Sequence, residues 1–453
     1  MKAVIVGAGM AAARLADGLV GHDVTVLGDE AHPPYNRILL SAVLEGTHSP
    51  DALALAMWDA DLRLDTRVVE IHRAEREVEL ADRSRVPYDV LVLATGSIPT
   101  LPPIRGIVRV DGRLDDRVHA FRTLGDCLRL DGAVRSARRA VVVGGGLLGV
   151  QVARALGVRG LAVEVVEGGD HLLRSQVDAK AGAILARDLA RLGASVYTGA
   201  RATRLTDDGL VLDNGFTLDT DLVVLTAGGR PSTALARRAG LEVRRGVVVD
   251  HLLRTSDPAI HAIGDCAQHG GQVTGFVPPA WEQATLLSRH LNGEQVRYDG
   301  ARTVARLRAT GLEVAVLGEP ERAAGDVVEV TNPIAGSHRK LVVRDGVIVA
   351  GTLVGDLSRI GLITQYYDRC SVLAPNEPGS LLMGGRATTC STTGWRPTAL
   401  PDEAEICACA GVSAGRIRAC ASLDEARDTT RATTGCGGCA TAVRDLVMEG
   451  APA

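Results

Sequence analysis

Four of the nine cysteines form two close pairs near the end of this 453-residue chain. Cys407 and Cys409 make the first pair, and Cys436 and Cys439 make the second. Four thiolates with this spacing can converge on one centre, which favours an iron–sulfur cluster. A tetrahedral zinc site uses the same ligands and stays open as an alternative. A c-type haem is disfavoured because Ala440 stands where a histidine would follow Cys439, and a thioredoxin-type dithiol would account for only one pair.

A glycine-rich turn opens the chain and has the spacing of a dinucleotide site. A buried strand at residues 2–6 runs into Gly7, Gly9 and Ala12, and then into an alanine-rich helix. The N–H groups at the start of such a helix can hold a pyrophosphate; Gly9 lets it approach the backbone, and Ala12 lets helix and strand pack. Asp29 follows Gly9 by 20 residues and is suited to binding the hydroxyl pair of a ribose.

A second unit of the same kind follows the first. Gly144, Gly146 and Gly149 give the full three-glycine pattern after another buried strand, and Glu167 follows Gly146 by 21 residues. A carboxylate in that position accepts hydrogen bonds from a 2′-hydroxyl and repels a 2′-phosphate, so we expect NADH to be preferred over NADPH. Arg174 is near enough in sequence to soften this preference.

Two dinucleotide sites in one chain indicate that one cofactor delivers hydride and the other receives it. Together with Thr95, Gly96, Gly264 and Asp265, the order of these motifs resembles the two-dinucleotide-binding flavoprotein reductases over roughly residues 1–310. In that family the first unit holds FAD and the second holds NAD(P)H. The resemblance implies that Asp265 binds the ribityl or pyrophosphate part of FAD, next to Gly264. It also implies that Thr95 and Gly96 mark the crossover between the two domains.

The same resemblance assigns roles near the flavin. Arg37 matches an arginine directed toward the FAD phosphates, and Trp281 matches a segment near the flavin ring, with domain packing as the open alternative. Relatives often carry a glutamate near the nicotinamide where this chain has Gln151. Residues 36–48 contain Ser41 but no cysteine, so chemistry of the glutathione-reductase or peroxidase type is excluded. Hydride transfer needs no side-chain acid or base, and we assign no catalytic residue.

The elements that position these residues are expected to form an α/β protein. We expect two Rossmann-like dinucleotide-binding domains in a two-dinucleotide-binding flavoprotein fold, then a mostly β domain, a linker and a small α-helical [2Fe–2S] domain. The expected boundaries are 1–110 for the first part of the FAD domain, 111–234 for the NAD(P)H domain, 235–303 for the second part of the FAD domain, 304–383 for an α+β interface domain, 384–401 for the linker and 402–453 for the [2Fe–2S] domain.

The last module resembles the bacterioferritin-associated-ferredoxin type of [2Fe–2S] domain. The resemblance rests on C-x-C at residues 407–409 and on Thr-Thr-Gly-Cys-Gly-x-Cys at residues 433–439. It implies that the four cluster ligands are Cys407, Cys409, Cys436 and Cys439. A helix at residues 440–447 would face the cluster sulfurs with its N–H groups. We expect Cys420 in the middle of a helix as a buried apolar residue, and we assign Cys127 and Cys266 to packing.

This order of domains resembles the electron-transfer subunits of bacterial assimilatory nitrate and nitrite reductases, and the N-terminal half of NAD(P)H nitrite reductase large subunits. The resemblance implies an FAD-dependent NAD(P)H oxidoreductase. It would pass electrons from NADH through FAD and the [2Fe–2S] cluster to a separate catalytic subunit of nitrate assimilation, either a molybdenum nitrate reductase or a sirohaem nitrite reductase. A ferredoxin or rubredoxin reductase and a redox- or iron-sensing flavoprotein remain alternatives.

Composition excludes other classes of protein. Only 3% of the residues are aromatic and the net charge is −4, which argues against a base-stacking or polyanion-binding surface and hence against nucleic acid as a partner. No stretch approaches the 18 to 20 apolar residues of a membrane span. The chain starts without a basic leader, and its clustered cysteines fit a reducing compartment, so we expect a cytoplasmic location.

Overall fold

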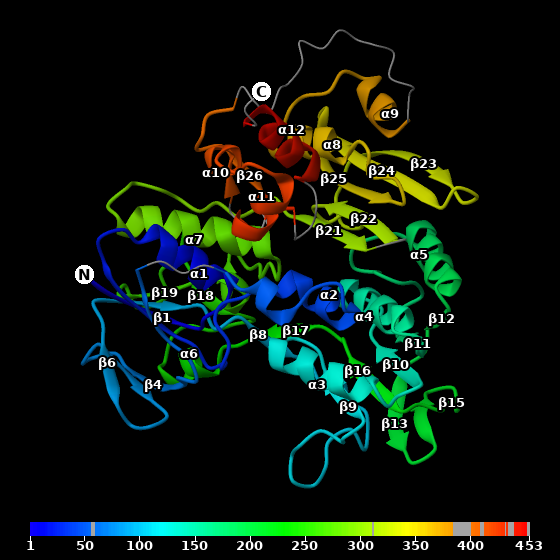
Figure 1. Ribbon diagram of the computed structural model, residues 1–453, viewed down its shortest axis with the longest axis horizontal. Coiled ribbons are helices and arrows are strands. Elements are labelled where there is room, and N and C mark those ends of the chain that lie inside the picture. The colour runs from blue at the N-terminus through cyan, green and yellow to red at the C-terminus, as the bar shows by residue number, and fades with distance from the viewer. Residues whose placement is uncertain are drawn as a thin grey trace. The chain divides into compact units, whose positions relative to one another are not determined.

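The computed structural model describes residues 1–55, 59–309, 312–383, 400–407, 412–430, 432–433 and 439–450 (Figure 1). Cys409, Cys436 and most of the expected linker lie outside these residues. Contacts between residues divide the chain into two compact units. The first unit comprises residues 1–174 and 189–303, and the second comprises residues 175–188 and 304–453.

A five-stranded parallel sheet follows the order β19-β7-β1-β2-β3 and carries the first glycine turn. Its strands are β1 (Lys2–Val6), β2 (Asp23–Leu27), β3 (Asp61–Arg63), β7 (Val90–Leu93) and β19 (Ile260–Ala262). The last four residues of β1 are buried, as expected for a central strand covered on both faces. Helix α1 (Met10–Gly18) packs against α7 (Val277–Leu291), and both contribute to the core of this sheet.

A second parallel sheet repeats this arrangement around the second glycine turn. Its order is β12-β11-β10-β16-β9, with β10 in the place that β1 has in the first sheet. The strands are β9 (Val118–Ala120), β10 (Arg139–Val143), β11 (Ala162–Glu167), β12 (Ala194–Thr198) and β16 (Leu222–Leu225), and the helices are α3 (Leu124–Val134) and α4 (Leu147–Val158). Helix α5 (Ala179–Arg191) belongs mainly to the second unit. The expectation of two Rossmann-like sheets is therefore confirmed.

Short strands complete the first unit, as two antiparallel three-stranded sheets, one antiparallel pair and one parallel pair. They are the three-stranded sheets of β4 (Val68–His72), β5 (Glu77–Leu80) and β6 (Arg85–Pro87) and of β13 (Ala202–Thr206), β14 (Gly209–Leu212) and β15 (Thr217–Leu218), and the pairs of β8 (Ser97–Pro99) with β17 (Gly229–Pro231) and of β18 (Val247–Val249) with β20 (Ala267–His269). The remaining helices are α2 (Leu40–Glu45), α6 (Ala234–Arg238) and the 3₁₀ turns η1 (Arg37–Leu39), η2 (Pro50–Leu53) and η3 (Gly264–Cys266).

An antiparallel sheet forms the main part of the second unit, in agreement with the expected β domain. Its order is β21-β22-β25-β24-β23, from strands β21 (Val304–Ala309), β22 (Leu312–Leu317), β23 (Asp326–Asn332), β24 (Ser337–Arg344) and β25 (Val347–Val354). Helices α8 (Ile360–Asp368) and α9 (Glu377–Leu382) follow it. Leu341, Ile348 and Leu353 of the sheet share one core with Ile363 and Leu382 of the helices.

The last described segments build a small module with a core of its own. It contains β26 (Glu405–Cys407), β27 (Val412–Ser413), α10 (Ala414–Arg418), α11 (Leu423–Thr430) and α12 (Ala440–Gly450). The expectation that Cys420 lies in the middle of a helix is wrong, because it lies between α10 and α11. The Ser422 hydroxyl accepts from Glu425 N, and the Glu425 carboxylate accepts from Ala421 N, so a capping motif starts a new helix here. Cys420 is nevertheless buried.

Cys127 and Cys266 are buried in the first unit, as expected for packing residues. Their thiols donate to backbone carbonyl oxygens, from Cys127 to Leu40 O at 3.4 Å and from Cys266 to Leu93 O at 3.3 Å. Burial raises the pKa of Cys127 to about 12 and also raises the pKa of Cys266. Neither thiol therefore supplies a thiolate at neutral pH.

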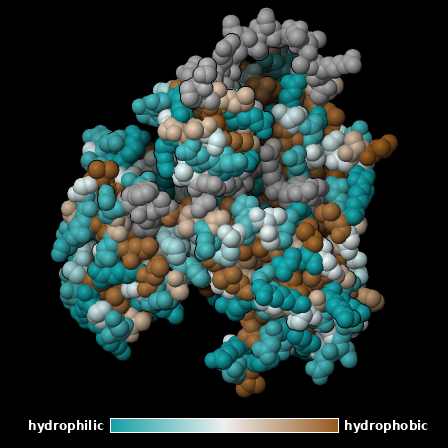
Figure 2. Space-filling model, viewed as in Figure 1, coloured by the Kyte–Doolittle hydropathy of each residue, from teal (hydrophilic) through white to brown (hydrophobic). Residues whose placement is uncertain are grey.

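The exposed large hydrophobic residues come from unrelated elements, Val20, Phe216 and Ile334 among them. On the face drawn in Figure 2, hydrophobic residues are scattered among hydrophilic ones. Among the described residues, no helix combines the length and apolar composition needed to cross a bilayer.

Candidate functional site

The first glycine turn leaves an open backbone surface at the start of α1. Gly7 N donates to Leu27 O at 2.8 Å, and a Cβ on Gly7, whose φ is +105°, would lie 2.4 Å from Ala94 O. No atom lies within 4 Å of the Cβ position on Gly9. Gly9 is extended at the N-cap, and no side chain caps the helix. The geometry fits a phosphate group received by backbone N–H groups.

The second turn has the same geometry and tighter packing. Gly144 N donates to Val166 O at 2.9 Å, and a Cβ on Gly144 would lie 2.7 Å from Thr226 O. Space is again open at Gly146, whereas a Cβ on Gly149 would lie 1.8 Å from Gly144 O. Any side chain at Gly149 would displace the turn.

The two acids expected at the ribose positions are held differently. Asp29 is exposed beyond the end of β2. Its neighbour Glu30 pairs with Arg37 and accepts from the Tyr35 hydroxyl at 2.7 Å. Glu167 accepts from Gly145 N at 2.8 Å and from Gly169 N at 2.6 Å, and Arg174 Nε lies 3.5 Å from its carboxylate. Glu167 is therefore oriented by backbone donors on both sides.

The remaining residues expected near FAD gather around the start of α1. A Cβ on Gly7 would lie 3.2 Å from Thr95 N, and a Cβ on Gly264 would lie 3.5 Å from Ala11 Cβ. Thr95 Oγ1 donates to Ser232 O at 2.8 Å. Gly96 O accepts from Ser232 N at the start of the β8–β17 pairing. The Trp281 indole Nε1 donates to Met10 O at 3.0 Å, which anchors α7 to the first turn of α1.

Arg122 is a candidate site residue that sequence reasoning missed. It follows β9, the edge strand of the second sheet, and its guanidinium lies 2.5 Å from the Asp265 carboxylate, which follows β19, the edge strand of the first. Ser97 Oγ donates to the same carboxylate at 2.8 Å. The Arg37 guanidinium donates to the Arg122 carbonyl at 3.3 Å. The carboxyl ends of two edge strands, from two sheets, thus meet at one ion pair.

This ion pair leaves hydrogen-bonding capacity for a ligand. Arg122 Nε is buried, and among the described residues it has no hydrogen-bond partner. A buried donor without an acceptor is costly unless a bound group satisfies it. A charged donor of this kind fits an anionic group such as the pyrophosphate of a dinucleotide. The sequence signal was an arginine placed directly before the capping box of Thr123 and Asp126, which fixes its position at the start of α3.

Two of the four expected cluster cysteines lie within the described residues. Cys407 ends β26 and Cys439 is the N-cap of α12, because Val443 N donates to Cys439 O at 2.9 Å. Both are buried in the core of the last module. A sulfur at a helix N-terminus is stabilised as a thiolate. These two buried cysteines fit part of the ligand set of an iron–sulfur or zinc centre.

Other polar groupings in the second unit do not involve the expected site residues. Asp178, Glu329 and His338 place ligand atoms within 4.8 Å of one another. Lys180 Nζ lies 2.6 Å from Glu329 and Lys340 Nζ lies 3.5 Å from Asp178, so ammonium groups already balance the two carboxylates.

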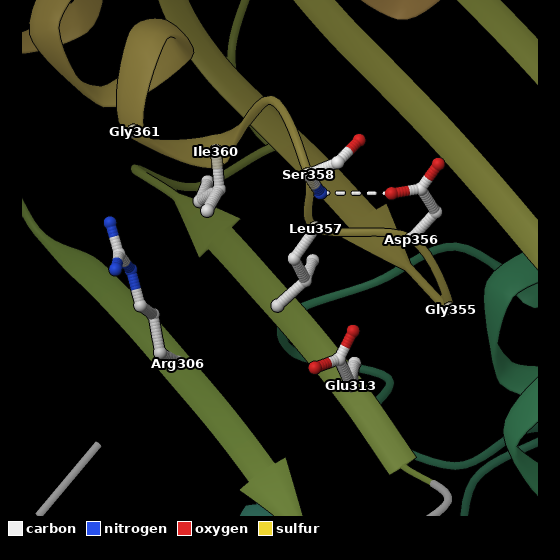
Figure 3. A pocket seen from close by; sticks show the side chains of 8 residues that line it. All are labelled: Arg306, Glu313, Gly355, Asp356, Leu357, Ser358, Ile360 and Gly361. Atoms are coloured by element: carbon white, nitrogen blue, oxygen red, sulfur yellow. Dashed lines mark hydrogen bonds between the residues drawn. The ribbon is translucent and has the colours of Figure 1, made fainter. Parts of the chain in front are cut away.

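A cavity of about 530 Å³ lies beside β21, β22 and the segment that precedes α8 (Figure 3). Arg306 lines one side, and Glu313 and Asp356 line the other, where Asp356 accepts from Ser358 N at 2.8 Å. The lining mixes both charges, and none of the expected site residues belongs to it.

Known proteins resemble the chain in sequence and in fold. Residues 1–284 match the family model described as pyridine nucleotide-disulphide oxidoreductase. The chain is 33% identical over 472 residues to nitrite reductase (NAD(P)H) of Bacillus subtilis (strain 168), covering 98% of this chain and 57% of that protein. It is 30% identical over 472 residues to the assimilatory nitrate reductase electron transfer subunit of the same organism, covering 98% of this chain and 59% of that protein. The solved putidaredoxin reductase–putidaredoxin complex matches with a TM-score of 0.75 and 25% identity, over 84% of this chain and 95% of that one.

These comparisons confirm the expected fold and the expected resemblance to nitrate and nitrite reductase proteins. The chain spans a little more than half the length of the two curated relatives. The family model covers more than half of the chain and includes both glycine turns. The chain therefore belongs to the pyridine nucleotide-disulphide oxidoreductase family.

Proposed function

We propose that this protein is an NADH-dependent oxidoreductase that passes electrons through FAD and a [2Fe–2S] cluster to a separate catalytic reductase subunit. The observation that carries the proposal is the pair of glycine turns with matching geometry in one unit, linked by the Asp265–Arg122 ion pair. Two dinucleotides held this way form a donor and an acceptor. The relatives named for nitrite and nitrate reduction support a nitrite or nitrate reductase subunit as the electron acceptor.

The chain's own residues bind and orient the first cofactor. The turn containing Gly7, Gly9 and Ala12 receives the FAD pyrophosphate, and Arg122 supplies a charged donor to it. Asp29 binds the adenosine ribose, whereas Asp265 and Gly264 face the ribityl or pyrophosphate part. The other residues that we place around FAD are Arg37, Thr95, Gly96 and Trp281. When bound, FAD supplies the conversion of a two-electron hydride donor into a source of single electrons.

The second turn, with Gly144, Gly146 and Gly149, receives the pyrophosphate of NADH. Glu167 already points both carboxylate oxygens at backbone N–H groups beside this turn, so its charge is fixed next to the ribose position. A fixed negative charge disfavours a 2′-phosphate, which supports NADH as the donor. Arg174, mostly exposed and 3.5 Å from Glu167, offers a cation for NADPH as a weaker donor.

The exit path runs through the last module. Cys407 and Cys439, with Cys409 and Cys436, would ligate the cluster, and α12 would direct its N-terminal N–H groups toward the sulfurs. From the cluster, electrons pass to a separate nitrate or nitrite reductase subunit. A molybdenum nitrate reductase and a sirohaem nitrite reductase are distinguished by the metal that co-purifies with this chain.

Anaerobic titration with NADH tests the electron path. We expect flavin bleaching followed by the electron paramagnetic resonance signal of a reduced [2Fe–2S] cluster. Cys436→Ser should retain flavin bleaching and lose the cluster signal and the reduction of the partner. Purified protein with flavin and zinc would overturn the exit path alone, and protein that binds no flavin would overturn the whole proposal.

A second candidate is a reductase of a separate small electron carrier. It is favoured by the match to a putidaredoxin reductase in complex with putidaredoxin. In that case Cys436→Ser would leave the reduction of an added ferredoxin or rubredoxin unchanged. The same variant therefore separates the two functions.

A further inference from the structure

Two helices form one of the contacts between the two dinucleotide-binding halves of the first unit. Helix α2 follows Arg37 and η1 in the first half, and α4 begins at the second glycine turn. They pack against each other, and Figure 1 draws them side by side. Cofactors held by the two halves must approach each other for hydride transfer, so the fit of one half on the other, which includes the packing of α2 on α4, bears on their distance.

A buried ion pair joins the two helices. The Arg154 guanidinium donates twice to the Glu45 carboxylate, at 2.6 and 3.0 Å. The Arg154 side chain is 5% exposed and the Glu45 side chain 14% exposed. A two-point arginine–carboxylate contact fixes the angle between its partners as well as their distance. An apolar contact of the same area would fix neither so closely.

A second arginine, at the C-cap of α4, holds the same end of α2. The Arg159 guanidinium donates to Leu44 O at 2.8 Å and to Asp131 of α3 at 2.7 Å. Leu44 O is one of the last carbonyls of α2, which ends at Gly46 in the left-handed conformation. Cationic groups at a helix C-terminus stabilise it. Arg154 and Arg159 therefore fix the axial position of α2 from α4.

The ion pair lies one helical turn from Ser41 and from Gln151, the position where relatives often carry a glutamate near the nicotinamide. Ser41 and Glu45 are four residues apart on α2, and Gln151 and Arg154 are three residues apart on α4. Residues with these spacings share a helix face. A shift at the Glu45–Arg154 contact is therefore transmitted to the turns of Ser41 and Gln151.

We propose that Glu45 and Arg154 are positioning residues that set the distance and angle between the nicotinamide and flavin rings. The inference rests on the proposed function, because it needs both cofactors. Hydride transfer, which moves two electrons and one proton from the dihydronicotinamide to the flavin, requires reacting atoms about 3–3.5 Å apart, and a displacement of about 1 Å can cost roughly a hundredfold in rate.

Two substitutions test this role: Glu45→Gln keeps the side-chain size and removes the charge, and Arg154→Lys keeps the charge and removes the two-point contact. In both variants the rate constant of flavin reduction at saturating NADH should fall by about 10- to 100-fold. The dissociation constant of NADH and the flavin content should change by less than about twofold, because the Glu45–Arg154 ion pair joins the two helices rather than the glycine turns. The primary isotope effect with deuterated NADH should increase as ring approach becomes limiting. An unchanged rate constant and isotope effect would overturn the inference.

Hydrogen–deuterium exchange provides a readout that needs no activity. Amides of α2 in both variants should exchange faster, with and without flavin, whereas the Gly7 and Gly144 turns should keep their protection. The charge-swapped variant Glu45→Arg/Arg154→Glu should recover much of the protection and of the hydride-transfer rate. Swapped charges that recover protection but not the rate would show a structural role only, and would overturn the positioning role.

A matched control is the exposed pair of Arg139 and Asp219, at the end of β10 opposite the glycine turn. Asp219→Asn should change neither the rate constant nor the exchange of α2. Wild-type protein that binds no flavin, or whose flavin NADH does not reduce, would overturn the proposed function and this inference with it. A normal wild type with unaffected Glu45 and Arg154 variants would overturn this inference alone.

Discussion

The two halves of the first unit share one backbone design and differ in their side chains. Gly7 and Gly144 bond the neighbouring parallel strand in the same way, and Gly9 and Gly146 leave the same open space. The strand order around β1 is repeated around β10. Backbone packing alone dictates these features, and so they recur wherever a dinucleotide must approach a helix N-terminus.

The two halves differ at positions where side chains, and not the backbone alone, shape the site. The first turn accommodates the methyl group of Ala12, whereas the second brings Gly144 O to within 1.8 Å of where a Cβ on Gly149 would lie. Asp29 is exposed, whereas Glu167 is held by two backbone donors. The second site is therefore the more rigid, which suits a mobile substrate that must be oriented at each turnover.

The largest effect should come from Gly149→Ala, which makes the second turn match the first in sequence. The new Cβ meets backbone that cannot move without breaking the β10 end, so we expect a loss of at least about 3 kcal/mol in the stability of the second half. Urea unfolding should show this loss, while flavin absorbance is retained. Gly146→Ala is the control: it fills open space and should weaken NADH binding with little change in stability. Equal stability of the two variants would contradict the packing argument.

A smaller effect is expected for Arg122→Met, which removes the second half's contribution to the first site. The loss of one charged donor should weaken FAD binding by about 10- to 100-fold, corresponding to about 1.5–3 kcal/mol. Fluorescence titration of flavin-free protein measures this change. The control is Arg129→Met, an exposed arginine on the neighbouring helix α3 that lies outside the Asp265 contact. FAD affinity that is unaffected by Arg122→Met would remove Arg122 from the site.

The sequence could predict what the backbone alone determines. Glycine spacing and buried strands were sufficient for both turns and both sheets, whereas the role of Asp265 was implied by the family resemblance and stays a prediction. The Arg122 contact could not be predicted in this way, because it joins residues 143 positions apart that follow the edge strands of two different sheets. The place of Cys420 was wrong because a local capping motif outweighed apolar periodicity.

Acid should act more strongly on the first half than on the second. Each sheet has a histidine on an edge strand, His261 on β19 and His119 on β9. Burial lowers the pKa of His261 from 6.5 to about 4, and burial also lowers the pKa of the less buried His119. Below pH 6.5 the imidazole of His261 binds a proton in the unfolded chain but not in the folded chain. The free energy of unfolding therefore decreases as the pH falls toward 4.

For His261 this loss is about 2 kcal/mol between pH 7.5 and pH 5. Urea unfolding gives the free energy of unfolding at each pH. In His261→Leu, the difference between the values at pH 7.5 and pH 5 should be about 2 kcal/mol smaller than in the wild type. His119→Leu should reduce the difference by less. A wild-type acid sensitivity that neither substitution reduces would assign it to other groups.

The smallest effect should come from Arg174→Ala at the second site. Arg174 is mostly exposed, so its attraction to a 2′-phosphate is screened and worth about 0.2–1 kcal/mol. Removing it should lower the apparent affinity for NADPH by about two- to fivefold and leave that for NADH unchanged, as measured by flavin reduction over a range of nucleotide concentrations. Because salt screens the attraction between Arg174 and the 2′-phosphate, the effect of the substitution on NADPH affinity should be larger at low salt concentration. An equal loss of affinity for NADH and NADPH would mean that Arg174 supports Glu167 or the loop around it. Attraction of the 2′-phosphate to Arg174 would then no longer explain any use of NADPH.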